Sequence, residues 1–202
     1  MGKSSLWVKA GVTAVMAICV ALPGRCAEKS MVVKKPLVQV AILLDTSGSM
    51  SGLIGQAKTE LWRIVNLFAS AKKGGVTPEL QVALYEYGKS ALPASGGYLR
   101  MIRSLTGDLD AISEEIFALS TDGGEEYCGR VIGEAVRDLA WSPSGGDYKA
   151  LFIAGNEPFT QGEIDFRKSC AAATAKGIAV NTIFCGAHGE GIQTFWKEGA
   201  DL

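Results

Sequence analysis

Two patterns of apolar residues alternate along most of the chain. Short runs that are almost wholly apolar are typical of strands buried on both faces of a sheet, and longer segments with apolar residues every three or four positions are typical of helices. The runs that predict strands are residues 37–44, 80–87, 98–104, 148–154 and 178–184. The segments that predict helices are residues 53–70, 108–119, 129–141, 163–176 and 193–199. This alternation predicts an α/β fold with a doubly wound, mostly parallel sheet flanked by helices.

Polar residues and glycines mark the limits of several of these elements. Asp108 is placed to cap the helix that follows it, and Gly177 is placed to stop the helix that ends at Lys176. Residues 98–104 are more amphipathic than the other expected strands, which indicates a position nearer an edge of the sheet.

The first part of the chain has the pattern of an export signal. Lys3 and Lys9 precede an uncharged run at residues 10–24, which has about the length of a signal-peptide core. A membrane-spanning helix needs about 20 apolar residues, so an uncleaved anchor is the less favoured alternative. We predict a signal peptide at residues 1–27, a linker at residues 28–35, one domain at residues 36–202, and a periplasmic or secreted protein.

The charge of the chain changes when this signal is removed. The full chain has a net charge of −1, and removal of residues 1–27 takes away Lys3, Lys9 and Arg25 and no acid, which gives 17 minus 21, or −4. A mildly acidic protein lacks the basic footprint of nucleic-acid binding. Such a protein is suited to attract cations instead.

A polar cluster follows the first expected strand. Asp45, Ser47 and Ser49 stand at alternating positions, and in a parallel α/β sheet ligands bind at the carboxyl ends of the strands. One carboxylate and two hydroxyl groups form an oxygen set that suits magnesium, manganese or calcium better than zinc. The alternative is that Asp45 and Ser47 shape a turn and cap the next helix.

The segment DTSGSM at residues 45–50 resembles the D-x-S-x-S motif of von Willebrand factor type A domains. The resemblance covers residues 36–202 and is most specific over residues 40–61. It implies a doubly wound sheet and a divalent cation, Mg²⁺ or else Mn²⁺ or Ca²⁺, held by Asp45, Ser47 and Ser49. It also implies protein binding through that cation, with a partner's carboxylate completing the coordination.

The sequence departs from the family pattern in the middle loop, STDGGEEYCG. Glu125 follows the two glycines where the family usually has a threonine, and we predict it as the fourth metal ligand, with Glu126 or Thr121 as less favoured candidates. A carboxylate at this place would weaken the metal's attraction for a partner's acid.

A second departure follows the strand at residues 148–154. The family usually has Asp-Gly there, whereas this chain has Gly155, Asn156 and Glu157. Asn156 would reach the site through its amide oxygen or a water molecule, and Glu157 is expected to face solvent.

Three longer segments narrow the resemblance to an exported bacterial subgroup without an assigned activity. They are GGEEYCG, AGNEPFTQGEIDFRKSC and KGIAVNTIFCG. The family usually adds a last strand after the region of FWKEGADL, so we expect this sheet to lack that strand and residues 178–184 to form an apolar edge. The sequence would then be a fragment, a shortened product or one segment of a larger protein.

The remaining reactive side chains do not predict an enzyme. Cys128, Cys170 and Cys185 lie outside the signal peptide; two of them would pair in an oxidising compartment, or all would be buried and reduced. His188 is the single histidine and lies in a glycine-rich turn, so a hydrolytic triad is not indicated.

These observations favour an exported, non-enzymatic module that binds an unidentified protein through a divalent cation, with no nucleic-acid partner and no stable membrane insertion after cleavage. The first alternative is a structural domain whose vestigial site binds no metal. A metal-dependent hydrolase is the second alternative.

Overall fold

The computed structural model describes residues 35–202. The predicted signal peptide, and the predicted linker except for Lys35, lie outside the described residues. No helix within residues 35–202 is both long and apolar enough to span a membrane.

A five-stranded sheet forms the centre of the fold, in the order β3-β2-β1-β4-β5. Its strands are β1 (Leu37–Asp45), β2 (Glu79–Tyr87), β3 (Leu99–Thr106), β4 (Tyr148–Gly155) and β5 (Ile178–Phe184). β2, β1, β4 and β5 run parallel, and β3 pairs antiparallel with β2 through an irregular register. The predicted α/β fold with a mostly parallel sheet is confirmed, and both β3 and β5 lie at edges of the sheet.

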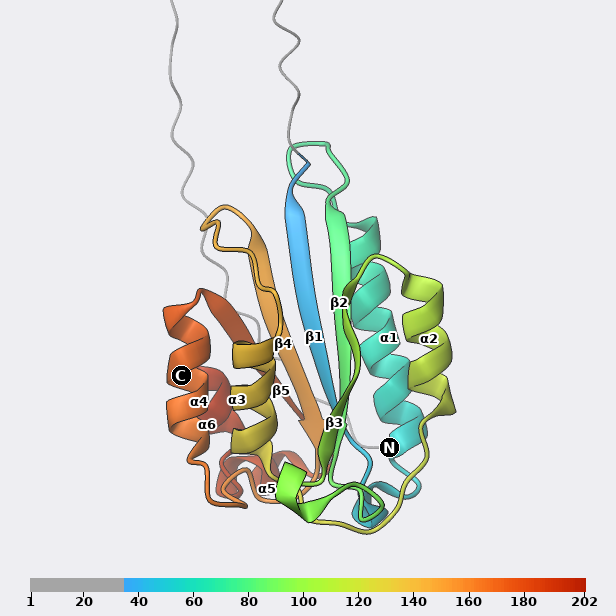
Figure 1. Cartoon of the computed structure of the whole chain (residues 1–202), viewed down its shortest axis with the longest axis vertical. Coiled ribbons are helices and arrows are strands. Elements are labelled where there is room, and N and C mark those ends of the chain that lie inside the picture. Colours follow the sequence, from blue (N-terminus) through green and yellow to red (C-terminus); the bar gives the residue numbers. More distant parts are fainter. Residues whose placement is uncertain (1–34) are drawn as a thin grey trace, which may run out of the picture.

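Helices cover both faces of this sheet (Figure 1). One face packs against α1 (Ile54–Ser70) and α2 (Leu109–Ala118), and the other against α3 (Cys128–Asp138) and α4 (Phe166–Ala175). Two short helices, α5 (His188–Gln193) and α6 (Trp196–Asp201), follow β5, and α6 packs on the same face as α3 and α4. Single turns of 3-10 helix lie at Gly48–Met50 and Ala94–Gly96.

The apolar run in β1 is explained by burial on both sides. Val40, Ile42 and Leu44 belong to the core under α1 and α2, whereas Ala41 and Leu43 belong to the core under α3 and α4. Because side chains alternate across a strand, a central strand covered on both faces has no polar side. The polar Asp45 therefore marks the point at which β1 leaves the core.

The structure places some helix limits differently from the sequence pattern. α4 begins at Phe166 because the Asp165 carboxylate caps it, accepting the N–H of Arg167 at 3.0 Å. The predicted helix at residues 193–199 is two helices, separated at Phe195, whose φ of 70° is left-handed. His188 starts α5 and is not in an open turn. The predicted cap at Asp108 is confirmed, because its Oδ1 accepts the N–H of Ala111 at 3.0 Å.

Candidate metal centre

Asp45 is the last residue of β1, at the carboxyl edge of the parallel strands and between β2 and β4. Its side chain is fully buried. One carboxylate oxygen, Oδ1, accepts the backbone N–H of Ser47 at 2.8 Å. The other, Oδ2, is buried and has no hydrogen-bond partner. This oxygen lies on the side of Gly155, where a Cβ atom would be 2.9 Å from it, whereas Oδ1 lies on the side of Ser47 and Glu126. A buried carboxylate with so few partners is costly.

The two serines converge beside Asp45, as their alternate spacing predicts. Ser47 Oγ lies 2.9 Å from Ser49 Oγ. Ser49 Oγ donates to Asn156 Oδ1 at 2.9 Å, and Asn156 Nδ2 donates to the Ser49 carbonyl at 3.3 Å. Asn156 therefore orients Ser49 from the loop after β4. Ser47 is buried and Ser49 is exposed, so the set of oxygens reaches from the core to the surface.

Glu126, and not Glu125, is the acid of the middle loop that lies beside Asp45. The Glu126 side chain is 6% exposed, whereas Glu125 is exposed. A Cβ atom built on Gly88 would lie 2.8 Å from Asp45 Oδ1, 3.0 Å from Glu126 Cγ and 3.2 Å from Ser47 Cβ. These three side chains thus share one wall of the site. Of the two adjacent acids, Glu126 is therefore the one that lies beside Asp45, and Glu125 lies at the surface.

The glycines of this loop explain why Glu126, and not Glu125, turns toward Asp45. A Cβ on Gly48 would lie 3.4 Å from Gly123 Cα, and a Cβ on Gly124 would lie 2.7 Å from the Gly88 carbonyl carbon. The N–H of Asp122 also donates to the Thr46 carbonyl at 3.0 Å. The glycine pair therefore packs backbone against backbone, and the chain turns Glu126 inward only after this contact.

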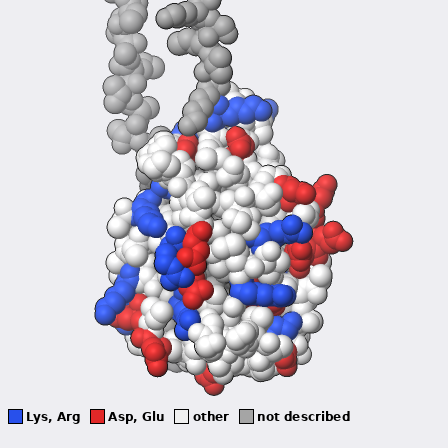
Figure 2. Space-filling model, viewed as in Figure 1, with Lys and Arg blue, Asp and Glu red and all other residues white. Residues whose placement is uncertain are grey.

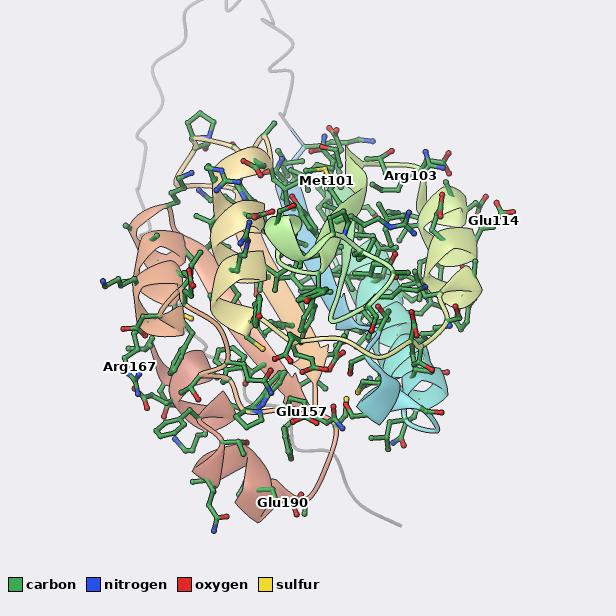
Figure 3. All side chains as sticks on the ribbon, turned by 60° about the horizontal axis from the view of Figure 1, so that its bottom comes forward. Met101, Arg103, Glu114, Glu157, Arg167 and Glu190 are labelled. Carbon is green, nitrogen blue, oxygen red and sulfur yellow. The ribbon has the colours of Figure 1, made fainter. Side chains whose placement is uncertain are left out.

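The loop after β4 brings a third carboxylate to the site, as Figure 3 shows for Glu157. Glu157 is half-buried, so the expectation that it faces solvent is only partly right. Gln161 joins it to the middle loop: its Nε2 donates to Glu157 Oε2 at 3.5 Å, and its Oε1 accepts the N–H of Glu126 at 3.2 Å. The Trp196 indole N–H donates to the Glu157 carbonyl at 2.7 Å. No sequence motif marks Gln161, because it stands in a loop without a recognisable pattern.

Burial and neighbouring negative charge disfavour the ionised forms of the acids at this edge of the sheet. Burial raises the pKa of Asp45 to about 6, against the lowering effect of its hydrogen bonds with Ser47. Burial, and then the charge of Asp45, raises the pKa of Glu126 to about 7. None of the ion pairs found within residues 35–202 involves Asp45, Glu126 or Glu157. The negative form of these side chains therefore lacks a protein cation.

The donor set suits a hard divalent cation. Carboxylate and hydroxyl oxygens are the ligands that magnesium, manganese and calcium prefer. No group of three or more His, Cys, Asp or Glu side chains within residues 35–202 is placed to hold a metal. A cation here would thus depend on the hydroxyl groups of Ser47 and Ser49 together with Asp45 and Glu126.

All three cysteines within residues 35–202 are free thiols; Cys128 and Cys170 are buried, and Cys185 is partly buried. Cys128 lies under the site, with its Sγ 3.8 Å from the Tyr87 hydroxyl, and burial raises the pKa of its thiol far above the usual range. Burial raises the pKa of Cys185 to about 12. These raised values are typical of inert packing cysteines and not of reactive ones.

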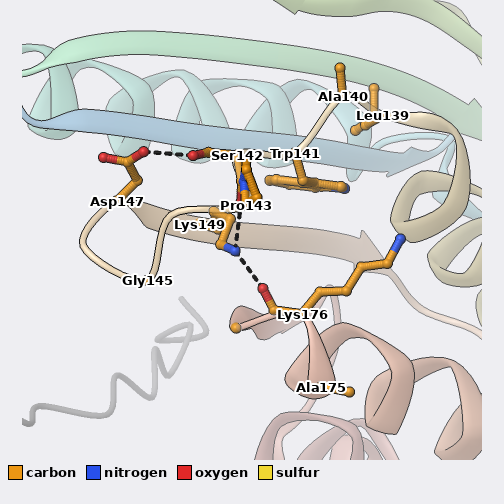
Figure 4. A pocket seen from close by; sticks show the side chains of 11 residues that line it. Leu139, Ala140, Trp141, Ser142, Pro143, Gly145, Asp147, Lys149, Ala175 and Lys176 are labelled. Carbon is orange, nitrogen blue, oxygen red and sulfur yellow. Dashed lines mark hydrogen bonds between the residues drawn. The ribbon is translucent and has the colours of Figure 1, made fainter.

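A cavity of about 590 Å³ lies at the other end of the sheet (Figure 4). Lys149 enters it from β4 and donates to the Ser142 carbonyl at 2.9 Å, while Lys176 donates to the Val136 carbonyl at 2.6 Å. Lys149 also donates to the carbonyl of Lys176, which caps the carboxyl end of α4, and Val136 lies in the last turn of α3. Both ammonium groups therefore lie near the carboxyl ends of helices, where positive charge is favourable. Their role is accounted for by this structural contact.

Comparison of the sequence with protein-family models and with curated proteins finds no match. Solved structures do resemble the fold. Proximal thread matrix protein 1 from the mussel byssus, in a form with a zinc-occupied MIDAS motif, has a TM-score of 0.57 and 13% identity over 73% of this chain and 35% of its own. The pilus adhesin SpaC from Lactobacillus rhamnosus GG, in an open conformation, has a TM-score of 0.52 and 16% identity over 73% of this chain and 24% of its own.

These neighbours are von Willebrand factor A-like domains, and the likeness shows that the chain shares their α/β fold. A second crystal form of the mussel protein gives a TM-score of 0.56 at 12% identity. The matched region is about a third or less of the length of these proteins. At such identities the comparison concerns architecture, and function has to be argued from the site.

Proposed function

We propose that the protein is an exported, non-enzymatic module that binds a protein partner through a divalent cation held by Asp45, Ser47, Ser49 and Glu126. The observation that carries the proposal is the convergence of the buried Asp45 carboxylate, the Ser47 and Ser49 hydroxyl groups and the buried Glu126 at the carboxyl end of β1. A cation among these oxygens would offset the repulsion between Asp45 and Glu126. We propose Mg²⁺ first, with Mn²⁺ and Ca²⁺ as further ions of the same ligand preference.

Each residue has a distinct part in this proposal. Asp45 supplies the central charge, Ser47 and Ser49 supply neutral oxygens, and Glu126 takes the place first assigned to Glu125. Asn156 holds Ser49 in position through the two hydrogen bonds described above. When bound, the cation would supply a positive centre near the exposed Ser49, where a partner can approach.

Two of the similar structures also support the proposal, one through its bound metal and the other as an adhesin. The mussel protein holds zinc in its MIDAS motif, and SpaC is an adhesin. The basic and apolar pattern of residues 1–27 supports export to the periplasm or the exterior.

One observation favours the structural alternative, in which the site binds no metal. The hydrogen bond from Ser47 N–H to Asp45 Oδ1 forms a closed turn without any ion. The two hypotheses differ in their response to added cation, because only a folded-state ligand raises stability.

Thermal unfolding in chelator and then with Mg²⁺, Mn²⁺ or Ca²⁺ tests the proposal. An ion at 100 times its Kd contributes about 2.7 kcal/mol, which raises the Tm by about 5–10 °C for a chain of this size. Asp45→Ala should abolish the rise. Glu126→Gln should reduce it, whereas Glu125→Gln, with the same charge change one residue away, should retain it. No rise with any ion in a folded sample would support the structural alternative. Hydrolysis abolished by Asp45→Ala would support the hydrolase.

A further inference from the structure

The two edges of the sheet differ in how they are protected against pairing with another strand. At one edge, β3 carries the exposed Arg100 and Arg103, each paired with an acid, and its register with β2 is irregular. Figure 2 shows charged side chains of both signs on the face of the molecule that carries β3. Charges and irregular pairing are devices that block an exposed strand. At the other edge, β5 has no charged residue, no proline and a regular register with β4, so it lacks this protection.

The backbone of β5 has open hydrogen-bonding groups along its outer side. Just after the strand, the N–H of Cys185 donates to the Gly155 carbonyl of β4 at 2.8 Å. Successive residues of a strand direct their N–H and C=O groups to opposite sides, so Val180, Thr182 and Phe184 direct theirs away from β4. Within residues 35–202, no strand pairs with this side of β5. Its backbone groups are therefore left to water or to a strand from outside the described chain.

The side chains of β5 indicate what kind of strand would fit beside it. On one face, Thr182 Oγ1 donates to the Trp196 carbonyl of α6 at 2.8 Å, and the rings of Phe184 and Trp196 lie 5.7 Å apart. On the other face, Ala179 is exposed and Ile183 is partly buried. An added strand would meet apolar or hydroxyl side chains on both faces. Its own residues should therefore be uncharged, and β-branched ones pack best in such a place.

The position of α6 favours a separate strand over a second copy of this chain. Side chains alternate across a strand, so two β5 strands paired antiparallel would place both α6 helices on the same face of the joined sheet. Adjacent strands lie about 4.8 Å apart, whereas packed helices need about 8–10 Å between their axes. Because α6 packs on β5 itself, two copies would bring these helices too close together. A strand that brings no helix meets no such obstacle.

We infer that the β5 edge captures an extended, uncharged segment of a partner protein, which adds one more strand to the sheet. The segment would form backbone hydrogen bonds with Val180, Thr182 and Phe184, and it would place small or β-branched side chains beside Ala179 and Ile183. This edge is separated from β1 by the whole of β4, so the binding goes beyond the proposed cation-dependent function and needs no cation.

The test uses residues 28–202, which keep every described element, and two labelled peptides of alternating valine and threonine with lysines at both ends. One peptide has an ordinary backbone, and in the other every backbone N–H is methylated, so that it cannot form a ladder of hydrogen bonds. Fluorescence anisotropy should show the ordinary peptide binding at least about tenfold more tightly. Hydrogen exchange should slow at Val180 and Thr182 when this peptide is bound, and should not change in β3.

Three variants locate the binding. Thr182→Pro removes one outward N–H from β5 and should abolish most of the binding. Because Thr182 also bonds to Trp196, Ala179→Lys is the second variant: the Ala179 side chain is exposed, and a charge beside the added strand should weaken binding several-fold. Met101→Lys is the matched control, because it places the same charge on an exposed residue of β3 and should leave binding unchanged. Circular dichroism should show that all three variants are folded.

Equal binding of the two peptides, or binding of neither, would overturn the inference. Slower exchange in β3 in place of β5 would do the same, and so would an equal loss of binding in Met101→Lys. Sedimentation of the protein without peptide tests the remaining occupant. A dimer that Thr182→Pro abolishes would mean that a second copy takes this edge, and the assignment to a separate strand would then be wrong.

Discussion

Replacement of Asp45 by asparagine should stabilise the metal-free protein at pH 8. In the folded chain the pKa of Asp45 is about 6 against an ordinary value of 3.8, because the carboxylate is buried. A difference of about two pKa units corresponds to about 3 kcal/mol that the charged form costs the folded state. Asparagine keeps an oxygen for the Ser47 N–H but leaves its own amide group unmatched, which costs about 1–3 kcal/mol. The expected net gain is up to about 2 kcal/mol.

The sign of the predicted stability difference follows from how the free energy of unfolding depends on pH. Because the folded-state pKa is raised, the folded protein binds more protons than the unfolded chain between about pH 4 and pH 7, and the free energy of unfolding falls as pH rises through that range. The variant lacks this contribution of Asp45. Its advantage should therefore be small at pH 5 and full at pH 8. Glu126, with a pKa of about 7, adds a loss of the same sign in both proteins.

Urea unfolding in chelator at pH 5 and pH 8 measures the effect, and added Mg²⁺ provides the second half of the test. The ion should stabilise the natural protein at pH 8 and leave Asp45→Asn unchanged. If the variant is less stable than the natural protein at pH 8, or if its advantage is the same at both pH values, the reasoning from burial is refuted.

Two further predictions concern residues around the centre. Gly88→Ala should cost at least 1–3 kcal/mol in urea unfolding and weaken Mg²⁺ binding, because Gly88 has a φ of 81° and a Cβ there would lie 2.8 Å from Asp45 Oδ1. Gly52→Ala, where φ is 88° but no atom lies within 4 Å, is the matched control and should leave ion binding intact. Cys128 should react with iodoacetamide at pH 7.5 only after denaturation, because it is fully buried with a raised pKa. Rapid labelling of Cys128 in the folded protein, followed by mass spectrometry, would contradict its position.

The parts of the fold that sequence predicts well are those set by local pattern. β1 is recognised because it is apolar on both faces, Asp45 is its last residue, and Ser47 and Ser49 follow within four residues. Ser47 is extended, whereas Ser49 lies in the 3-10 turn at Gly48–Met50, and this bend brings the two hydroxyl groups within 2.9 Å of each other. Asp108 is likewise recognised as a helix cap because capping is a contact over three residues.

The features whose positions in the structure differ from the sequence prediction depend on contacts between distant segments. Whether Glu125 or Glu126 faces Asp45 is decided by the packing of Gly123 and Gly124 on Gly48 and Gly88, which no local pattern contains. The division of the last helical segment depends on Phe195, whose left-handed backbone is unusual for a bulky residue.

The Gln161 side chain links the middle loop, which carries Glu126, to the loop after β4, which carries Glu157. One end of its amide holds the backbone of Glu126 and the other holds the carboxylate of Glu157. A displacement of either loop is therefore transmitted to the other through one side chain that carries no charge. Changes in the length of the 157–161 loop would be felt at Glu126, although that residue lies more than thirty positions earlier in the chain.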